Sequence, residues 1–177
     1  LIASLLAIKR IGAIYVPIDA QCPTARVEYI LGDSGTSLLL DEAWVEQHLS
    51  EISRQPLEWE PALSVETDLI DDAQKQALQE GIACILYTSG STGQPKGVKI
   101  RRGAIMNRLY WMWNRYPFQP HEVSCIKTSI GFVDHIWEIF GPLLQGIPSV
   151  LFKKDDLLDI GSFVEVLTKQ HVSRIVL

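Results

Sequence analysis

The sequence predicts an α/β fold in which helices flank a largely parallel sheet. Helix-like and strand-like segments alternate along the whole chain, which is the pattern typical of parallel sheets with crossover helices. The chain has 177 residues, the length of one ordinary domain, and 47% of them are hydrophobic, which is enough for one core. No internal repeat interrupts this pattern, so we expect a single α/β unit.

The N-terminal part is expected to contain two helix–strand pairs. In order, these are a helix at 5–11, a strand at 13–17, a helix at 23–31 and a buried strand at 37–40. Gly12 closes the first helix, while Pro23 and Thr24 open the second. Over residues 41–80 the pattern weakens and acidic residues become frequent, which indicates a variable surface excursion.

Regular patterning returns in the C-terminal part. The expected elements are strands at 83–88 and 98–101, a helix at 103–113, a strand at 123–128, a helix at 135–145, a strand at 149–152, a helix at 163–170 and a final strand at 174–177. Ile105, Leu109 and Met112 form one stripe, which favours core packing over ligand binding. Ligands bind at the carboxyl ends of parallel strands, where the loops after Thr88 and Thr128 fall.

Composition argues against several functions. A net charge of −5 disfavours nucleic acid or an anionic membrane as the main partner. No apolar run reaches the roughly 18 residues of a membrane-spanning helix. The three cysteines lack C-x-x-C spacing, which suggests neither a zinc site nor a disulfide framework. We therefore expect a cytoplasmic protein with no metal site in this chain.

Both ends of the sequence resemble interrupted elements. The chain begins without methionine inside an apolar helical pattern and stops within an expected strand. Open apolar edges of this kind favour aggregation in a complete protein. The expectation is that residues 1–177 form a partial domain, truncated at both ends.

A loop rich in glycine and hydroxyl groups follows the strand at 83–88. Its features are the glycines Gly90, Gly93 and Gly97, the hydroxyl donors Thr88, Ser89, Ser91 and Thr92, and the cation Lys96. Glycines that adopt positive φ let backbone N–H groups converge on an anion, so the loop is suited to bind phosphate. An ordinary surface turn is the alternative, and the G-x-x-x-x-G-K-[ST] spacing of the Walker phosphate loop is absent.

Residues 87–97 resemble the signature Y-T-S-G-S-T-G-x-P-K-G of the adenylate-forming superfamily at every fixed position. Residues 7–19 resemble the family motif L-K-A-G-A-A-Y-V-P-L-D, which is scaffold and binds nothing directly. The resemblance implies part of the large N-terminal subdomain of such an enzyme, acting on ATP. It also implies catalytic roles for Lys96 and Thr92, and binding of the ATP phosphates by Thr88, Ser89, Gly90, Ser91, Thr92, Gly93 and Lys96.

A second motif lies at 129–143 and resembles F-D-x-S-x-W-E-x-F-G-P-L of the adenylation domains of non-ribosomal peptide synthetases. In that family the Asp after the Phe pairs with the α-ammonium of the substrate. Here Val133 holds that position and the acid is Asp134. The resemblance implies that Asp134 binds the substrate ammonium, and that Phe132, Val133 and Trp137 shape the pocket.

The displaced carboxylate predicts a displaced ammonium, because a charge pair that loses hydration is strong only when its geometry is good. A β-amino acid provides such a shift through its extra methylene. Residues 107–109, 127–128 and 132–134 also resemble the β-alanine-activating adenylation domains of the Ebony type. The hypothesis is therefore activation of a β-amino acid such as β-alanine.

Alternatives remain at each position of the second motif. Asp134 could be a helix N-cap, which stabilises a helix by about 1 kcal/mol without any ligand. Trp137 could be a core residue, His135 is interpreted as helix surface, and Glu138 is expected to serve helix structure or packing. For the whole protein the alternatives are an α-amino-acid adenylation domain, an acyl-CoA synthetase for a non-amino acid, and a non-catalytic fragment.

The resemblance also implies cofactors and partners. These are ATP, Mg²⁺ with its ligands outside this fragment, an amino-acid substrate, and phosphopantetheine on a carrier domain downstream or in trans. Neither nucleic acid nor a membrane is among the expected partners. Later family motifs have no counterpart before Leu177, so the chain alone is expected to be inactive.

Overall fold

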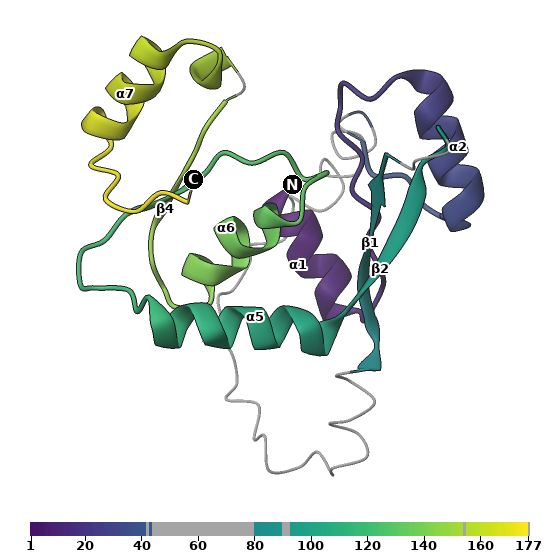
Figure 1. Cartoon of the computed structure of the whole chain (residues 1–177), viewed down its shortest axis with the longest axis horizontal. Coiled ribbons are helices and arrows are strands. Elements are labelled where there is room, and N and C mark those ends of the chain that lie inside the picture. Colours follow the sequence, from purple (N-terminus) through teal and green to yellow (C-terminus); the bar gives the residue numbers. More distant parts are fainter. Residues whose placement is uncertain (42, 44–79, 90–92, 154, 177) are drawn as a thin grey trace, which may run out of the picture.

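The structure is a computed structural model that describes residues 1–41, 43, 80–89, 93–153 and 155–176. It has the expected α/β character, with helices around short strands (Figure 1). The helices are α1 (Ile2–Arg10), α2 (Thr24–Ser34), α5 (Arg102–Arg115), α6 (Asp134–Leu143), the short 3₁₀ helix η2 (Asp155–Leu157) and α7 (Ile160–Lys169). The strands are β1 (Ile82–Thr88), β2 (Lys96–Arg101), β3 (Ser124–Ile126) and β4 (Ser149–Leu151).

The strands pair in two separate ways. β1 and β2 form an antiparallel hairpin, whereas β3 and β4 pair in parallel through a helical crossover that contains α6. Tyr15 adds a parallel bridge to Cys84 of β1. The pairing is thus mixed where a largely parallel sheet was expected, because the short connection at 89–95 can return only as a hairpin.

Three predicted strands are wrong for the residues that the structure describes. Segment 13–17 contributes only the bridge at Tyr15, and segments 37–40 and 174–176 form no strand. An apolar run becomes a strand only where a neighbouring strand pairs with it, and the described part of the chain supplies none to Leu38 or Leu39. Most of the predicted excursion at 41–80 lies outside the described residues.

The core lies where α1, α5, α6 and β1 meet, with α6 packed beside α5 and the hairpin at the end of α5 (Figure 1). It contains Leu5, Tyr15, Cys84, Leu86, Leu109, Met112, Ile126, Ile136, Trp137, Ile139 and Phe140. Two side-chain hydrogen bonds to backbone carbonyls join the helices. Trp113 Nε1 donates to Gly141 O at 2.9 Å, and Arg102 donates to Gly12 O at 2.7 Å.

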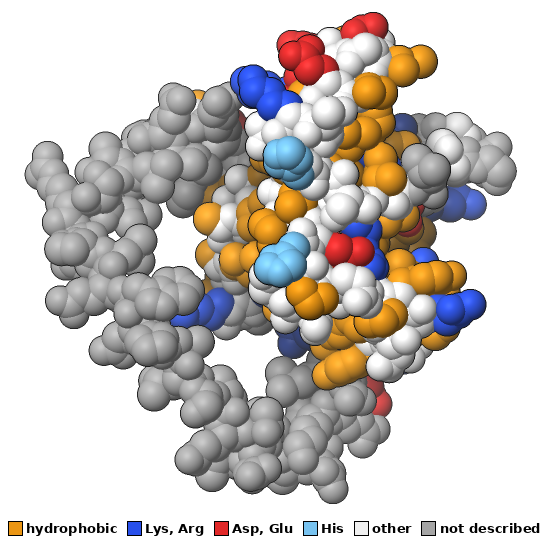
Figure 2. Space-filling model, turned by 90° about the vertical axis from the view of Figure 1, so that its left-hand side faces the viewer, with side chains coloured by type: hydrophobic (Ala, Val, Ile, Leu, Met, Phe, Trp, Pro, Cys, Tyr) orange, Lys and Arg blue, Asp and Glu red, His pale blue; other side chains and the backbone are white. Residues whose placement is uncertain are grey.

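Helix α7 lies apart from this core, on the opposite side of the molecule from α2 (Figure 1). None of its residues is buried, although its side chains segregate into an apolar and a polar face. Figure 2 shows hydrophobic side chains gathered on this side of the molecule. Ile160 and Val164 of α7 are exposed, as is Leu158 just before it. This face therefore presents apolar surface that the described residues leave uncovered.

Candidate functional site

The predicted phosphate loop connects the two strands of the hairpin. Thr88, the last residue of β1, pairs with Lys96, the first residue of β2, so both flank the mouth of the loop. Thr88, Ser89 and Lys96 are exposed, and Gly93 has φ of +84°. The described part of the loop thus places hydroxyl groups and an ammonium at one open end, which suits a polyphosphate. Gly90, Ser91 and Thr92 lie outside the described residues.

Close packing fixes the strands beneath this loop. A Cβ added at Gly97 would lie 3.0 Å from Ile85 Cγ2 and 3.1 Å from Tyr87 Cζ, so the cross-strand contact requires glycine there. Tyr87 donates a hydrogen bond of 2.6 Å to Asp33 of α2. Burial, together with this carboxylate, raises the pKa of Tyr87 to about 12. The hydroxyl therefore stays protonated and keeps β1 attached to α2.

The second motif begins in the β3–α6 turn, which comprises residues 127–133. Ser129 of this turn donates a hydrogen bond of 2.5 Å to the Asp19 carboxylate. Tyr15 pairs with Cys84 in parallel, so the chain from Tyr15 to Asp19 runs in the same direction as β1 from Cys84 to Thr88. This register supports the expectation that the phosphate loop and the β3–α6 turn lie at the same edge of the fold.

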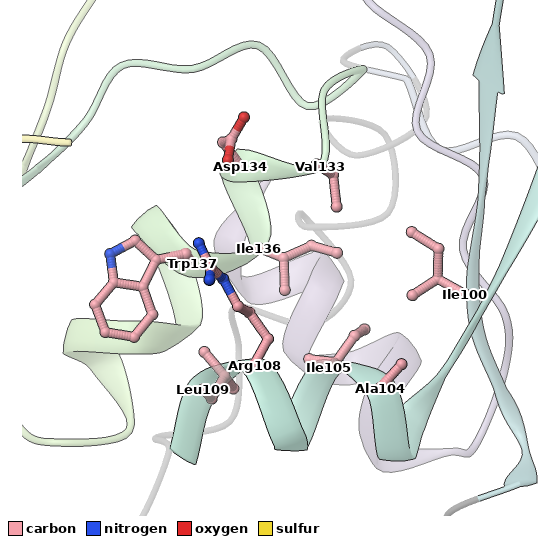
Figure 3. Close-up of a pocket in the computed structure, with 9 residues that line it drawn as sticks. All are labelled: Ile100, Ala104, Ile105, Arg108, Leu109, Val133, Asp134, Ile136 and Trp137. Carbon is pink, nitrogen blue, oxygen red and sulfur yellow. The ribbon is translucent and has the colours of Figure 1, made fainter. Parts of the chain in front are cut away.

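A cavity of about 390 Å³ opens beside the turn, between α5, α6 and β2. Its lining residues are Ile100, Ala104, Ile105, Arg108, Leu109, Val133, Asp134, Ile136 and Trp137 (Figure 3). The lining is apolar apart from Asp134 and Arg108, and the volume is in the range of small-molecule sites. The cavity can therefore enclose the apolar part of a small ligand, with one carboxylate and one guanidinium among its lining residues.

The predicted substrate residues occupy different places around this cavity. Val133 points toward Ile100 and Ile136, whereas Asp134 lies at the rim with its carboxylate directed away from them (Figure 3). Trp137 is a core residue that also lines the cavity, since it is buried and stacks on Phe118. Phe132 is 67% exposed and does not line this cavity, and its part in shaping a substrate pocket stays a prediction.

The helix-cap alternative for Asp134 receives no support from the geometry. The N-cap of α6 is Val133, and no side chain caps this helix. Asp134 is instead the first helical residue, where a carboxylate interacts favourably with the helix dipole. Its side chain is exposed and makes no hydrogen bond within the described residues. A carboxylate in this state is available to a ligand.

Glu138 holds the start of the β3–α6 turn. Its carboxylate is almost fully buried and accepts hydrogen bonds of 2.8 Å from the backbone N–H groups of Lys127 and Thr128. It also accepts from the Thr128 hydroxyl at 2.8 Å and the Lys127 ammonium at 3.1 Å. The expected structural role of Glu138 is confirmed, and its partners lie in the preceding turn. This geometry fixes where the second motif leaves β3.

The placement of His135 on the helix surface is wrong. His135 is completely buried, and its Nε2 lies 2.9 Å from the hydroxyl of Tyr15. Its Nδ1 lies 2.5 Å from the carbonyl oxygen of Phe132. Burial lowers the pKa of His135, which favours the neutral ring. Helix α6 is buried on nearly all sides, so a polar residue in it does not mark the surface.

Sequence reasoning missed several residues that line the cavity. Ile105 and Leu109 were assigned to the core alone, yet they also form the cavity floor, and Arg108 contributes a cation from the same helix. The Arg108 guanidinium lies 4.8 Å from the Trp111 ring centre, and its side chain extends from α5 toward α6 (Figure 3). Spacing on α5 could have indicated this, since 104, 105, 108 and 109 share one helical face.

Gly141 sets the position of Trp137. A Cβ at residue 141 would lie 2.7 Å from Trp137 Cε3, so Gly141→Ala is expected to displace the indole and destabilise the fold by about 1–3 kcal/mol. The matched control is Gly32→Ala in α2, where a Cβ meets nothing within 4 Å and alanine favours the helix by up to about 1 kcal/mol. Thermal unfolding of both variants should give shifts of opposite sign. A stable Gly141→Ala would contradict the tight packing at Trp137.

Neither a metal centre nor a membrane span is found in the part of the chain that the structure describes. No group of three or more His, Cys, Asp and Glu side chains is placed to hold a metal ion. No described helix has the length and apolar character needed to cross a bilayer.

The sequence matches the family model of the AMP-binding enzymes over residues 1–177. It is 34% identical over 182 residues to the β-alanyl-bioamine nonribosomal peptide synthetase ebony of Drosophila melanogaster, with 100% of this chain and 21% of that protein aligned. It is 31% identical over 178 residues to tyrocidine synthase 3 of Brevibacillus parabrevis, with 98% of this chain and 3% of that protein aligned. The chain therefore spans about a fifth or less of these relatives.

Solved structures share the fold. The N-terminal subdomain of Klebsiella oxytoca NpsA, in complex with 3-hydroxyanthranilyl-AMSN, superposes with a TM-score of 0.71 at 24% identity, covering 95% of this chain and 41% of that one. The Vibrio cholerae adenylation domain AlmE, in complex with glycyl-adenosine-5′-phosphate, superposes with a TM-score of 0.72 at 17% identity, covering 97% of this chain and 37% of that one. From the family match over its whole length and these relatives, the chain belongs to the AMP-binding, adenylate-forming enzyme family, with non-ribosomal peptide synthetases among its homologues.

Proposed function

We propose that the protein containing this chain activates an amino acid with ATP, and that the substrate is a β-amino acid such as β-alanine. The substrate carboxylate attacks the α-phosphorus of ATP, which forms an aminoacyl-adenylate and releases pyrophosphate. A phosphopantetheine thiol on a carrier domain then attacks the acyl carbon, which forms a thioester and releases AMP. The observation that carries the proposal is the apolar cavity between α5, α6 and β2, with Asp134 among its lining residues.

The position of the acid supports the choice of substrate. Successive residues of a helix project about 100° apart, so the carboxylate of Asp134 cannot occupy the direction that the Val133 side chain takes. Val133 points into the cavity, whereas the carboxylate of Asp134 points away from Ile100 and Ile136 (Figure 3). An ammonium one bond further from the reacting carboxylate suits the displaced acid. The name of the Drosophila relative, a β-alanyl-bioamine synthetase, agrees with this choice.

The phosphate loop would supply charge and hydrogen bonds to the nucleotide. Thr88, Ser89 and Gly93 contribute hydroxyl and backbone donors, together with Gly90, Ser91 and Thr92. Lys96 adds a positive charge at the mouth of the hairpin. Preorganised positive charge of this kind stabilises the negative charge that develops during attack on phosphorus. Mg²⁺ would neutralise part of the triphosphate charge, with its ligands outside residues 1–177.

A second candidate is an α-amino-acid adenylation domain, since the relatives include synthetases named for other products, such as tyrocidine synthase 3 at 31% identity. In that case a group other than Asp134 would bind the substrate ammonium. A non-amino acid as substrate is less consistent with the cavity, because a carboxylate at its rim would gain no partner from an apolar or aryl acid. These candidates predict different effects on substrate binding when the Asp134 carboxylate is removed.

The test is Asp134→Ala in the full-length protein, assayed by ATP–pyrophosphate exchange with β-alanine and with propionate, which lacks the amino group. Loss of a charge-assisted hydrogen bond is expected to raise the KM for β-alanine by about 10- to 100-fold and to leave propionate unchanged. The matched control is Asp155→Ala in η2, an exposed acid away from the cavity, which should change neither value. Equal effects on both acids would exclude Asp134 from ammonium recognition.

A further inference from the structure

The β3–α6 turn is hydrogen-bonded to the segment from Tyr15 to Asp19, which lies more than a hundred residues earlier in the chain. Asp19 accepts from the Ser129 hydroxyl at 2.5 Å, and the Tyr15 hydroxyl lies 2.9 Å from Nε2 of His135. Between these two contacts lie Val133 and Asp134, whose side chains line the cavity. The segment thus contacts the chain on both sides of the two residues that are proposed to face the substrate.

As a neutral ring, His135 has only one tautomer that can form hydrogen bonds to both of its neighbours. A carbonyl oxygen can only accept a hydrogen bond, so Nδ1 carries the proton and donates to Phe132 O. Nε2 then has a free lone pair and accepts from the hydroxyl of Tyr15. Lys9 and Glu138 are the other charged groups around this pair, together with Asp134 on the same helix. The ring therefore connects the Phe132 carbonyl directly to Tyr15.

The backbone of Tyr15 is itself hydrogen-bonded to β1. Its N–H donates to Ala83 O at 3.4 Å, and its carbonyl accepts from Ile85 N at 3.0 Å. Its side chain is buried, and the Lys9 ammonium lies 4.9 Å from its ring centre. Because the backbone of Tyr15 is paired with β1, its hydroxyl has a defined position from which it can hold the start of α6.

We infer that Tyr15 and His135 are positioning residues that hold the Phe132–His135 segment so that Asp134 meets the substrate ammonium. Tyr15 belongs to a motif that is expected to be scaffold alone, and the contact gives it an indirect part in substrate recognition. The reaction in which this positioning acts is the one proposed above. The prediction for the hydrogen bonds of the turn is independent of that reaction.

The first experiment measures hydrogen exchange by mass spectrometry on the full-length protein, comparing Tyr15→Phe with the wild type. Loss of the buried hydrogen bond is expected to speed exchange of amides in the segment 130–136 by about tenfold, with β1 and α5 unchanged. The matched control is Tyr110→Phe, which removes an exposed hydroxyl that makes no hydrogen bond within the described residues. Unchanged exchange at 130–136 would overturn the inference.

The second experiment separates positioning from general stability. In ATP–pyrophosphate exchange, Tyr15→Phe should raise the KM for the amino acid by about 3- to 10-fold and leave the KM for ATP unchanged. His135→Asn, which keeps a polar atom near Nδ1 but cannot reach Tyr15, should have the same effect. The KM of the double variant should be no higher than that of the single variants, because all three lose the same contact between Tyr15 and His135.

Two further outcomes have separate meanings. If the KM values for ATP and the amino acid rise together, or if exchange rises throughout the protein, the residues only stabilise the fold and the inference is wrong. If the wild type shows no amino-acid-dependent activity, the proposed function fails, while the exchange at 130–136 still decides whether Tyr15 holds the segment.

Discussion

Replacing Lys96 with alanine in the full-length protein is expected to lower the rate of adenylation by about 10²- to 10³-fold, the scale typical for loss of one preorganised electrostatic contact in an active site. Lys96 begins β2 directly opposite Thr88, so its ammonium lies at the mouth of the phosphate loop. Its removal takes away positive charge where the triphosphate is proposed to bind. The measurement is amino-acid-dependent ATP–pyrophosphate exchange, with thermal unfolding run in parallel.

Lys99→Ala is the matched control for this change. Lys99 is also an exposed lysine of β2, but three residues along a strand it projects from the opposite face. Its removal should change the rate less than twofold, as expected for a solvated surface charge. Similar losses in both variants would indicate a general effect of charge on the hairpin, and full activity of Lys96→Ala would remove Lys96 from the site.

Glu138→Gln is expected to cost on the order of 3 kcal/mol of stability, because a buried carboxylate that accepts hydrogen bonds from four donors becomes an amide that can serve only some of them. The Lys127 ammonium would also lose its ion-pair partner. The melting temperature should fall by several degrees, and amides of residues 127 and 128 should lose protection from hydrogen exchange.

The comparison variant is Glu122→Gln. Glu122 forms the other ion pair identified among the described residues, with Arg174 at 2.8 Å, and both side chains are partly exposed. Solvent screens this pair, so its loss is expected to cost about 1 kcal/mol or less. Equal unfolding temperatures of the two variants would contradict the stabilising role of Glu138, since burial of the carboxylate would then make no difference to stability.

Local signals in the sequence predicted the two strands of the hairpin, although not their antiparallel pairing. The apolar run at 83–88, the glycine-rich loop after it and the short segment at 98–101 indicate two strands, and β1 and β2 occur there. Helices α2, α5, α6 and α7 also begin or end within a few residues of their predicted bounds. These elements depend on glycine, proline and apolar spacing within one segment, which a single sequence displays directly.

The errors involve contacts between distant segments. Whether residues 37–40 form a strand depends on a partner that their own pattern does not contain. The burial of His135 depends on Tyr15, which lies 120 positions earlier. The cavity likewise combines residues of α5, α6 and β2, so its shape could not be predicted from any one motif. The ligand-facing role of Asp134 remains a prediction.

Amino-acid-dependent ATP–pyrophosphate exchange by the full-length protein is the decisive test of whether it activates a β-amino acid. The substrates are β-alanine, 3-aminobutyrate, L-alanine and a simple fatty acid. We expect exchange with β-alanine and 3-aminobutyrate well above that with L-alanine and the fatty acid. Exchange driven by L-alanine alone would keep amino-acid activation but contradict the role given to the displaced Asp134, and no exchange with any of the four would contradict the proposed activity itself.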